Sequence, residues 1–227
     1  DLTDDLSVEV TGISEDGVRT LRLKVPLDDP LYDPWRATPF PPYIERNESL
    51  AEAYQTIYAR DAGSKAAPTA GLHFTDALIR RLREQGMGWE EVTLHVGLGT
   101  FAPVKTERLE EHIMHSEWYR IDSSTAEHLN RAGHVTAVGT TSVRVLESAV
   151  GPDRQFSACS GETDIFIRPG YRFRAVDSLI TNFHLPKSTL LMLVAALTGF
   201  DEMHRIYRHA IEERYRFYSF GDAMLIV

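Results

Sequence analysis

The stretch Thr181-Asn182-Phe183-His184-Leu185-Pro186-Lys187-Ser188-Thr189-Leu190-Leu191-Met192 joins two segments of opposite character. An apolar, strand-like run at Ser178–Ile180 leads into it, and a helix is predicted to begin at Ser188 and to continue through Leu190–Leu197. Scaffolds rarely need Asn, His and Lys between two buried elements, so functional side chains often lie at such junctions. The alternative is a capped turn in which the side chains of Asn182 and His184 hydrogen-bond backbone groups that lack another partner.

Four further segments share this form, with small, hydroxyl and histidine residues at a strand edge. They are Ala67–Phe74, His95–Phe101, Val138–Arg144 and Ser219–Asp222. In open α/β sheets such loops line the crevice at the carboxyl ends of the strands, where ligands bind. Gly139-Thr140-Thr141-Ser142 precedes a predicted helix, so its free N–H groups and hydroxyls could hold an anion or sugar hydroxyls. It is no Walker motif, because the paired glycines and the lysine are absent.

The order of the predicted elements indicates the fold class. Residues 6–10 and 18–25 alternate apolar and polar around Glu15-Asp16-Gly17, which predicts a β-hairpin. The segment 28–42 is rich in Pro and Asp, and we place a domain boundary near residues 38–45. Helices are then predicted at 49–60, 75–86, 123–131, 141–149 and 201–215, and strands at 91–96, 135–138, 164–167, 176–180 and 224–227. This alternation predicts an α/β layered domain with a largely parallel or mixed sheet.

Composition excludes several classes of protein. No run reaches the roughly 18–20 apolar residues that a membrane-spanning helix needs. Cys159 is the one cysteine of the 227 residues, which excludes an internal disulfide framework and fits a reducing cytosol. The net charge of −9 argues against indiscriminate nucleic-acid binding.

Charge and histidine spacing leave two questions open. Residues 166–227 hold eight Lys/Arg against six Asp/Glu, and these basic residues could form a phosphate-facing patch or a merely solvated surface. The run His112-Ile113-Met114-His115-Ser116-Glu117 places imidazoles at i and i+3, but its spacing is not that of a zincin and no third ligand is evident. We expect these groups to bind a substrate or to act in acid–base chemistry, and we expect no metal.

Taken together, these segments resemble the S-adenosylmethionine:tRNA ribosyltransferase-isomerases, the QueA family of the queuosine pathway. The resemblance covers nearly all of residues 39–227, whereas residues 1–38 match only in character. The matching stretches are Ala67–Phe74, Leu94–Val104, His112–Glu117, Ala137–Ser148, Asp164–Gly170, Val176–Val194 and Tyr215–Leu225.

The resemblance implies both an architecture and a reaction. It implies a large layered α/β catalytic domain with a mixed sheet at residues 39–227, its N-terminal portion missing, and part of a small β-barrel domain at residues 1–38. Members are longer at the N-terminus, so this chain would correspond to the C-terminal two thirds. The implied reaction moves the ribosyl group of S-adenosylmethionine to 7-aminomethyl-7-deazaguanine at the tRNA wobble position and rearranges it. The products are epoxyqueuosine-tRNA, adenine and methionine.

That chemistry suggests roles for the loop residues. The acid–base candidates are His73, His95 and His184, since each lies in a glycine- or hydroxyl-rich loop. Asp222 and Glu117 are candidates for binding ribose hydroxyls or the sulfonium, and Asn182 for reading the base edge. Candidates for the methionine carboxylate are Thr140, Thr141, Ser142 and Arg144. Further substrate-binding candidates are Thr69, Gly71, Gly97, Thr100, His115 and Lys187.

The partners implied are tRNA and S-adenosylmethionine as co-substrate, for a cytoplasmic monomer that contacts no membrane. Two alternatives belong to other classes. A non-catalytic tRNA-binding module would bind tRNA whether or not S-adenosylmethionine is present. A nucleotide enzyme acting on a small molecule fits the acidic excess of residues 1–165 better.

Overall fold

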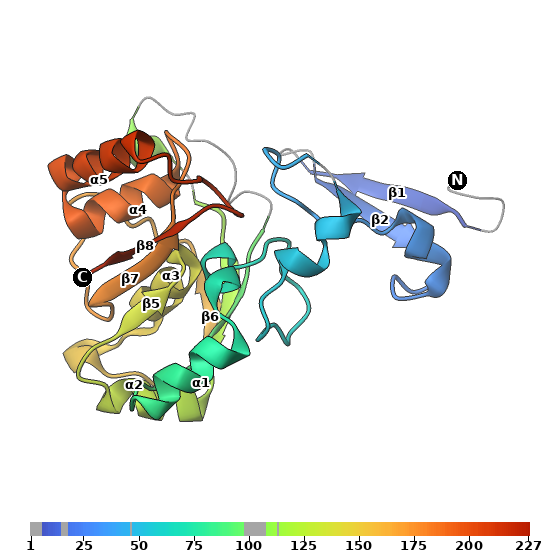
Figure 1. The fold of residues 1–227 in the computed structure, drawn as a ribbon. Coiled ribbons are helices and arrows are strands. Elements are labelled where there is room, and N and C mark those ends of the chain that lie inside the picture. The colour runs from blue at the N-terminus through green and yellow to red at the C-terminus, as the bar shows by residue number, and fades with distance from the viewer. Residues whose placement is uncertain (1–5, 15–17, 46, 98–107, 113) are drawn as a thin grey trace. The chain divides into compact units, whose positions relative to one another are not determined.

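The computed structural model describes residues 6–14, 18–45, 47–97, 108–112 and 114–227. The chain divides into two compact units, Asp1–Thr38 (unit 1) and Pro39–Val227 (unit 2). In unit 1, β1 (Val8–Ile13) pairs antiparallel with β2 (Arg19–Leu23), which confirms the predicted hairpin (Figure 1). The short 3₁₀ turn η1 (Pro30–Trp35) follows, and the Asp29 side chain caps it.

Unit 2 contains two three-stranded sheets among its described residues. One is antiparallel, in the order β3 (Thr93–His95), β4 (Glu117–Ile121), β6 (Cys159–Thr163). In the other, β5 (Thr136–Val138) runs parallel to β7 (Ser178–Asn182), and β8 (Ala223–Ile226) runs antiparallel on the far side of β7. The prediction of an α/β fold with a mixed sheet is therefore confirmed.

Five α-helices lie among the described residues, and their ends follow local capping rules. They are α1 (Asp76–Glu84), α2 (Ser123–Arg131), α3 (Thr140–Ala149), α4 (Thr189–Thr198) and α5 (Phe200–Glu212). Ser188 Oγ accepts the Leu191 N–H at 3.1 Å and so starts α4 where the sequence predicted it. Gly199, with φ of 85°, separates α4 from α5. Short 3₁₀ turns lie at Glu48–Leu50 (η2), Glu52–Tyr54 (η3), Thr69–His73 (η4), Leu109–Glu111 (η6) and Pro152–Arg154 (η7).

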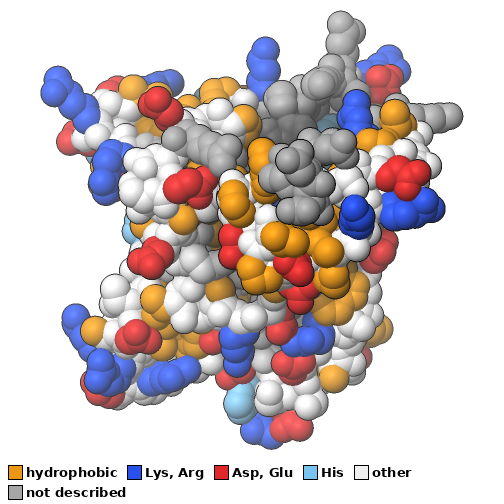
Figure 2. Space-filling view, turned by 90° about the vertical axis from the view of Figure 1, so that its right-hand side faces the viewer, with side chains coloured by type: hydrophobic (Ala, Val, Ile, Leu, Met, Phe, Trp, Pro, Cys, Tyr) orange, Lys and Arg blue, Asp and Glu red, His pale blue; other side chains and the backbone are white. Residues whose placement is uncertain are grey.

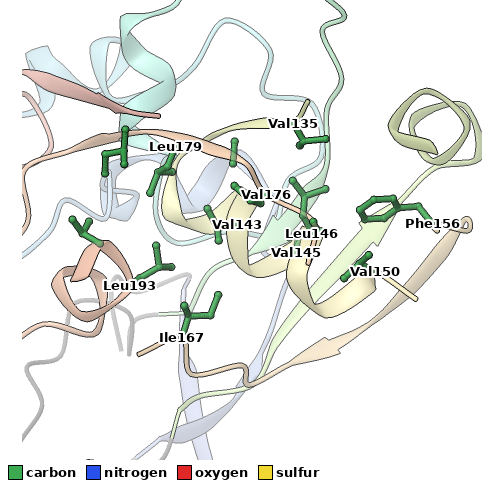
Figure 3. Packing of buried hydrophobic residues seen from close by; sticks show 14 of the residues in the cluster. Val135, Val143, Val145, Leu146, Val150, Phe156, Ile167, Val176, Leu179 and Leu193 are labelled. Carbon is green, nitrogen blue, oxygen red and sulfur yellow. The ribbon is translucent and has the colours of Figure 1, made fainter. Parts of the chain in front are cut away.

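Helix α3 forms the centre of the hydrophobic core. Its residues Val143 and Val145 are fully buried, and they pack in one cluster with Leu179 of β7 and Leu193 of α4 (Figure 3). Because α3 packs against strands of both sheets, its position fixes the ends of β3, β5 and β7 relative to one another.

Two predicted elements are wrong. The segment 49–60 is not one helix, because its aromatic side chains pack on separate neighbours: Tyr54 on Phe40 and Tyr58 on Trp89. Gln55 between them is extended, with φ of −137° and ψ of 142°. No strand forms at 164–167; β6 ends at Thr163, whose Oγ1 accepts the Ile165 N–H at 3.2 Å and turns the chain. Strand β4, which no pattern predicted, pairs with β6 instead.

Candidate active site

Three chain segments meet at one edge of the β5–β7–β8 sheet. Since β5 and β7 are parallel, their carboxyl ends lie at the same edge, and the Gly139 N–H donates to Ile180 O there at 2.8 Å. Strand β8 is antiparallel and starts opposite the end of β7, with Ala223 paired to Asn182. Asp222 therefore lies at the same edge as Gly139 and Asn182.

Asn182 connects this edge to the 3₁₀ turn η4. Its side chain is buried, and its Oδ1 accepts the Thr69 hydroxyl at 3.0 Å. Its Nδ2 lies 3.5 Å from His73 Nε2 and 3.5 Å from Asp222 O. These contacts bring Thr69, His73 and Asp222 around one buried amide, and they direct that amide into the protein.

Turn η4 fits closely between its neighbours. A Cβ built on Gly71 would lie 1.9 Å from Tyr58 Oη, so only glycine allows this approach. On another side, a Cβ built on Gly139 would lie 4.0 Å from Ala70 Cβ. The turn that carries His73 is thus held between Tyr58 and the start of α3, while His73 itself stays exposed.

Asp222 is held by Arg216, one of the basic residues that the sequence suggested for a phosphate-facing patch. Its Oδ1 accepts from Arg216 Nη2 at 2.7 Å and Nε at 3.2 Å, and its Oδ2 accepts the Arg216 backbone N–H at 2.8 Å. The hydrogen bonds from Arg216 lower the pKa of Asp222, and the charge of nearby His73 adds to this. Asp222 is therefore an ionised carboxylate beside an exposed imidazole.

His184 lies on the other face of β7. Successive residues of a strand point to opposite faces, and His184 Nε2 is 2.8 Å from the hydroxyl of Thr181, the neighbour of Asn182. Its backbone N–H donates to Tyr207 Oη of α5 at 2.9 Å. Burial lowers the pKa of His184 to about 4, so this imidazole is neutral near pH 7. The structure does not bring it together with His73.

A second cluster of candidates lies at the end of the β3–β4–β6 sheet. Glu117 and Arg144 form a buried ion pair, and Glu117 Oε1 also accepts the Gly97 N–H at 3.1 Å. The His95 ring packs on Trp118, with centroids 4.9 Å apart, and its buried Nε2 has no hydrogen-bond partner among the described residues. Arg144 thus faces β4, away from the anion position that the sequence suggested at the start of its helix.

The remaining candidates are placed separately. Helix α3 has no side-chain cap at Gly139, Thr140 is buried, and Ser142 Oγ donates to Val138 O at 2.8 Å. Lys187 and His115 are exposed, and Thr100 lies outside the described residues. The described residues contain no group of three His, Cys, Asp or Glu arranged to hold a metal ion.

The basic residues of the C-terminal segment are partly engaged within the protein. Arg205 pairs with Glu202 and Arg216 with Asp222, while the Arg174 guanidinium donates to Glu147 O. On the face shown in the space-filling view, acidic and basic side chains are interspersed (Figure 2).

Comparison with known proteins identifies the family. The family model described as "Queuosine biosynthesis protein" matches residues 2–226. The chain belongs to this family. The S-adenosylmethionine:tRNA ribosyltransferase-isomerase of Ralstonia pickettii is 57% identical over 213 residues, covering 91% of this chain and 59% of the relative. The enzyme of the same name from Erythrobacter litoralis is 51% identical over 238 residues, covering 100% of this chain and 68% of the relative.

A solved structure has a related fold. The crystal structure of S-adenosylmethionine tRNA ribosyltransferase from Thermotoga maritima is 38% identical, with a TM-score of 0.56. It covers 99% of this chain, which in turn spans 63% of that one. The chain thus spans about three fifths to two thirds of the length of its relatives. Among the described residues, no helix has the length and apolar character needed to cross a membrane.

Proposed function

We propose that the protein transfers the ribosyl group of S-adenosylmethionine to 7-aminomethyl-7-deazaguanine at the tRNA wobble position and isomerises it. The products are epoxyqueuosine-tRNA, adenine and methionine. The names of relatives with over half of their aligned residues identical support this reaction. The observation that supports a site for this reaction is the grouping of His73, Asn182 and Asp222 at the end of β7.

His73 is the base in this proposal. A hydrogen on C5′ of S-adenosylmethionine is acidified by the adjacent sulfonium, and a neutral imidazole can remove it to leave an ylide. The imidazolium so formed carries a proton that departing adenine needs. His73 suits this role because its ring is exposed and its Nε2 lies 3.5 Å from Asn182 Nδ2, at the same sheet edge as Asp222.

Asp222 and the start of α3 bind the substrate in this proposal. Three hydrogen bonds from Arg216 leave the outer lone pairs of Asp222 for a ribose hydroxyl, and its charge favours a nearby sulfonium. The backbone N–H groups of Thr140 and Thr141 would hold the methionine carboxylate, because the uncapped helix start favours an anion.

The other candidates receive supporting roles. Asn182 would hold η4 rather than read the base, since its amide is turned into the protein. Glu117 and Arg144 would hold the backbone at Gly97, whose N–H donates to Glu117. His95 and His184 remain secondary acid–base candidates. We further propose that residues 1–38 belong to a small β-barrel domain, and that the protein is a cytoplasmic monomer.

Adenine release tests the proposed function. The native protein is mixed with S-adenosylmethionine labelled in adenine, together with tRNA that carries either guanine or the aminomethyl-deazaguanine. We expect adenine only with the modified tRNA, because guanine lacks the accepting amine. Binding of tRNA without adenine release would indicate a binding module. Release without tRNA would indicate an enzyme acting on a small molecule.

A further inference from the structure

The loop that carries Asp222 is closed tightly on itself. The Asp222 N–H donates to Arg216 O at 2.8 Å, and the Gly221 N–H donates to Tyr218 O at 3.0 Å. A Cβ on Gly221 would lie 2.4 Å from Arg216 O, and Tyr218 adopts a left-handed φ of 71°. A loop this constrained moves as a body, so any contact that shifts it also shifts the Asp222 carboxylate.

One buried side chain in this loop bonds to a distant part of the chain. Ser219 is 4% exposed, and its Oγ lies 2.8 Å from Tyr43 Oη. The Tyr43 ring also packs on Tyr218, with centroids 5.1 Å apart. Burial is the main cause of the raised pKa of Tyr43, so this hydroxyl stays protonated and able to donate.

Tyr43 belongs to the segment that follows unit 1 directly. Unit 1 ends at Thr38, and the proline-rich run Pro39–Pro42 leads to Tyr43 within unit 2. Prolines restrict the backbone of this run, so the position of Tyr43 is coupled to the residues just before it. The loop of Asp222 is therefore fastened to the first residues of unit 2.

We propose that Tyr43 and Ser219 are positioning residues that act through Asp222. Their hydroxyl–hydroxyl bond fixes the loop 216–222 against the start of unit 2 and so sets the distance between the Asp222 carboxylate and His73. This inference rests on the proposed function, in which Asp222 binds S-adenosylmethionine. It assigns a role in the site to two residues that need not touch the substrate.

The test compares variants that remove the same hydrogen bond. In the native protein, Tyr43→Phe and Ser219→Ala should each raise the KM for S-adenosylmethionine about fivefold, the factor that corresponds to one neutral hydrogen bond. The double variant should raise the KM by less than the product of the two single effects, because both changes remove the same Tyr43–Ser219 bond. Tyr215→Phe is the matched control, since its half-exposed ring has no hydroxyl hydrogen bond among the described residues.

The Asp222→Asn background separates positioning from a general loss of structure. If Tyr43 acts through Asp222, Tyr43→Phe should have no added effect on adenine release once Asp222→Asn is present, measured with labelled substrate over long times. The proposal would be overturned if the effects of Tyr43→Phe and Asp222→Asn multiply in the combined variant. It would also be overturned if the KM is unchanged in both Tyr43→Phe and Ser219→Ala. If the unmodified protein releases no adenine, the proposed function fails. If it does so and the variants match it, only the positioning role fails.

Discussion

Glu147 is the side chain on which the packing of the 171–176 loop depends most. It is fully buried on α3 and accepts the backbone N–H groups of Arg174 at 3.0 Å, Ala175 at 2.9 Å and Val176 at 3.1 Å. The Tyr171 hydroxyl donates to it as well, at 3.0 Å. Burial, followed by this neighbouring charge, raises the pKa of Tyr171 to about 12. Four donors converge on one carboxylate, which satisfies a buried charge.

Replacing Glu147 should therefore destabilise the fold strongly. Glu147→Gln removes the charge and turns an NH₂ group toward backbone donors, which should lower the free energy of unfolding by about 3 kcal/mol. Urea titration measures this change. Glu127→Gln is the matched control, because Glu127 is exposed on α2 and pairs with the equally exposed Arg131. Equal stabilities for the two variants would contradict the role given to Glu147.

His184 should make stability depend on pH. Its pKa is about 4 in the folded protein and about 6.5 when unfolded, so the unfolded chain binds more protons between these values. Stability should be complete above pH 6.5 and should fall as pH drops toward 4, by up to about 3 kcal/mol. Urea unfolding of the native protein and of His184→Gln at pH 7 and pH 4.5 checks this. The same pH dependence in both proteins would show that His184 contributes none of it.

At the scale of elements, the turn between β5 and α3 requires glycine. Gly139 has φ of 88°, and a Cβ there would lie 3.2 Å from Thr141 Oγ1. Gly139→Ala should cost about 1–2 kcal/mol of stability and should weaken S-adenosylmethionine binding, because the start of α3 must shift. Thermal unfolding and the KM measure the two effects. Gly133→Ala is the control, since that glycine has no left-handed φ and a Cβ would meet nothing.

Sequence reasoning succeeded where the determinants are local. The helix over 123–131 and the start of α4 after Ser188 follow from periodicity and capping. The expectation that loops at strand ends meet at one edge also holds for Gly139, Asn182 and Asp222, because the parallel strands β5 and β7 end at the same edge. It failed at 49–60, where helical spacing reflects rings that pack on separate partners.

Contacts between residues far apart in the chain could not be predicted from the sequence. Glu147 bonds to a loop some 27 residues further along the chain, and Tyr43 and Ser219 are 176 residues apart. Arg216 and Asp222 are six residues apart in a loop with no periodicity. Thr181 and His184 lie on one face of β7, and Asn182 lies on the other. Which side of the sheet each face meets depends on the register of β7, and the sequence of one strand does not define that register.

For the whole molecule, the central claim is that catalysis takes place at the carboxyl edge of β5 and β7. Its direct test is single-turnover adenine release by the native protein and by the variants His73→Gln, His184→Gln and His128→Gln, with the modified tRNA. His128 is exposed on α2 and pairs with Glu90, and neither residue belongs to the segments that meet at this edge, so it is the control.

We predict that His73→Gln slows adenine release by about 10²- to 10⁴-fold, the usual contribution of a general base. His128→Gln should match the native rate, and His184→Gln should stay within about tenfold of it. A His73→Gln protein that folds normally and releases adenine at the native rate would contradict this claim, as would a loss of release confined to His184→Gln.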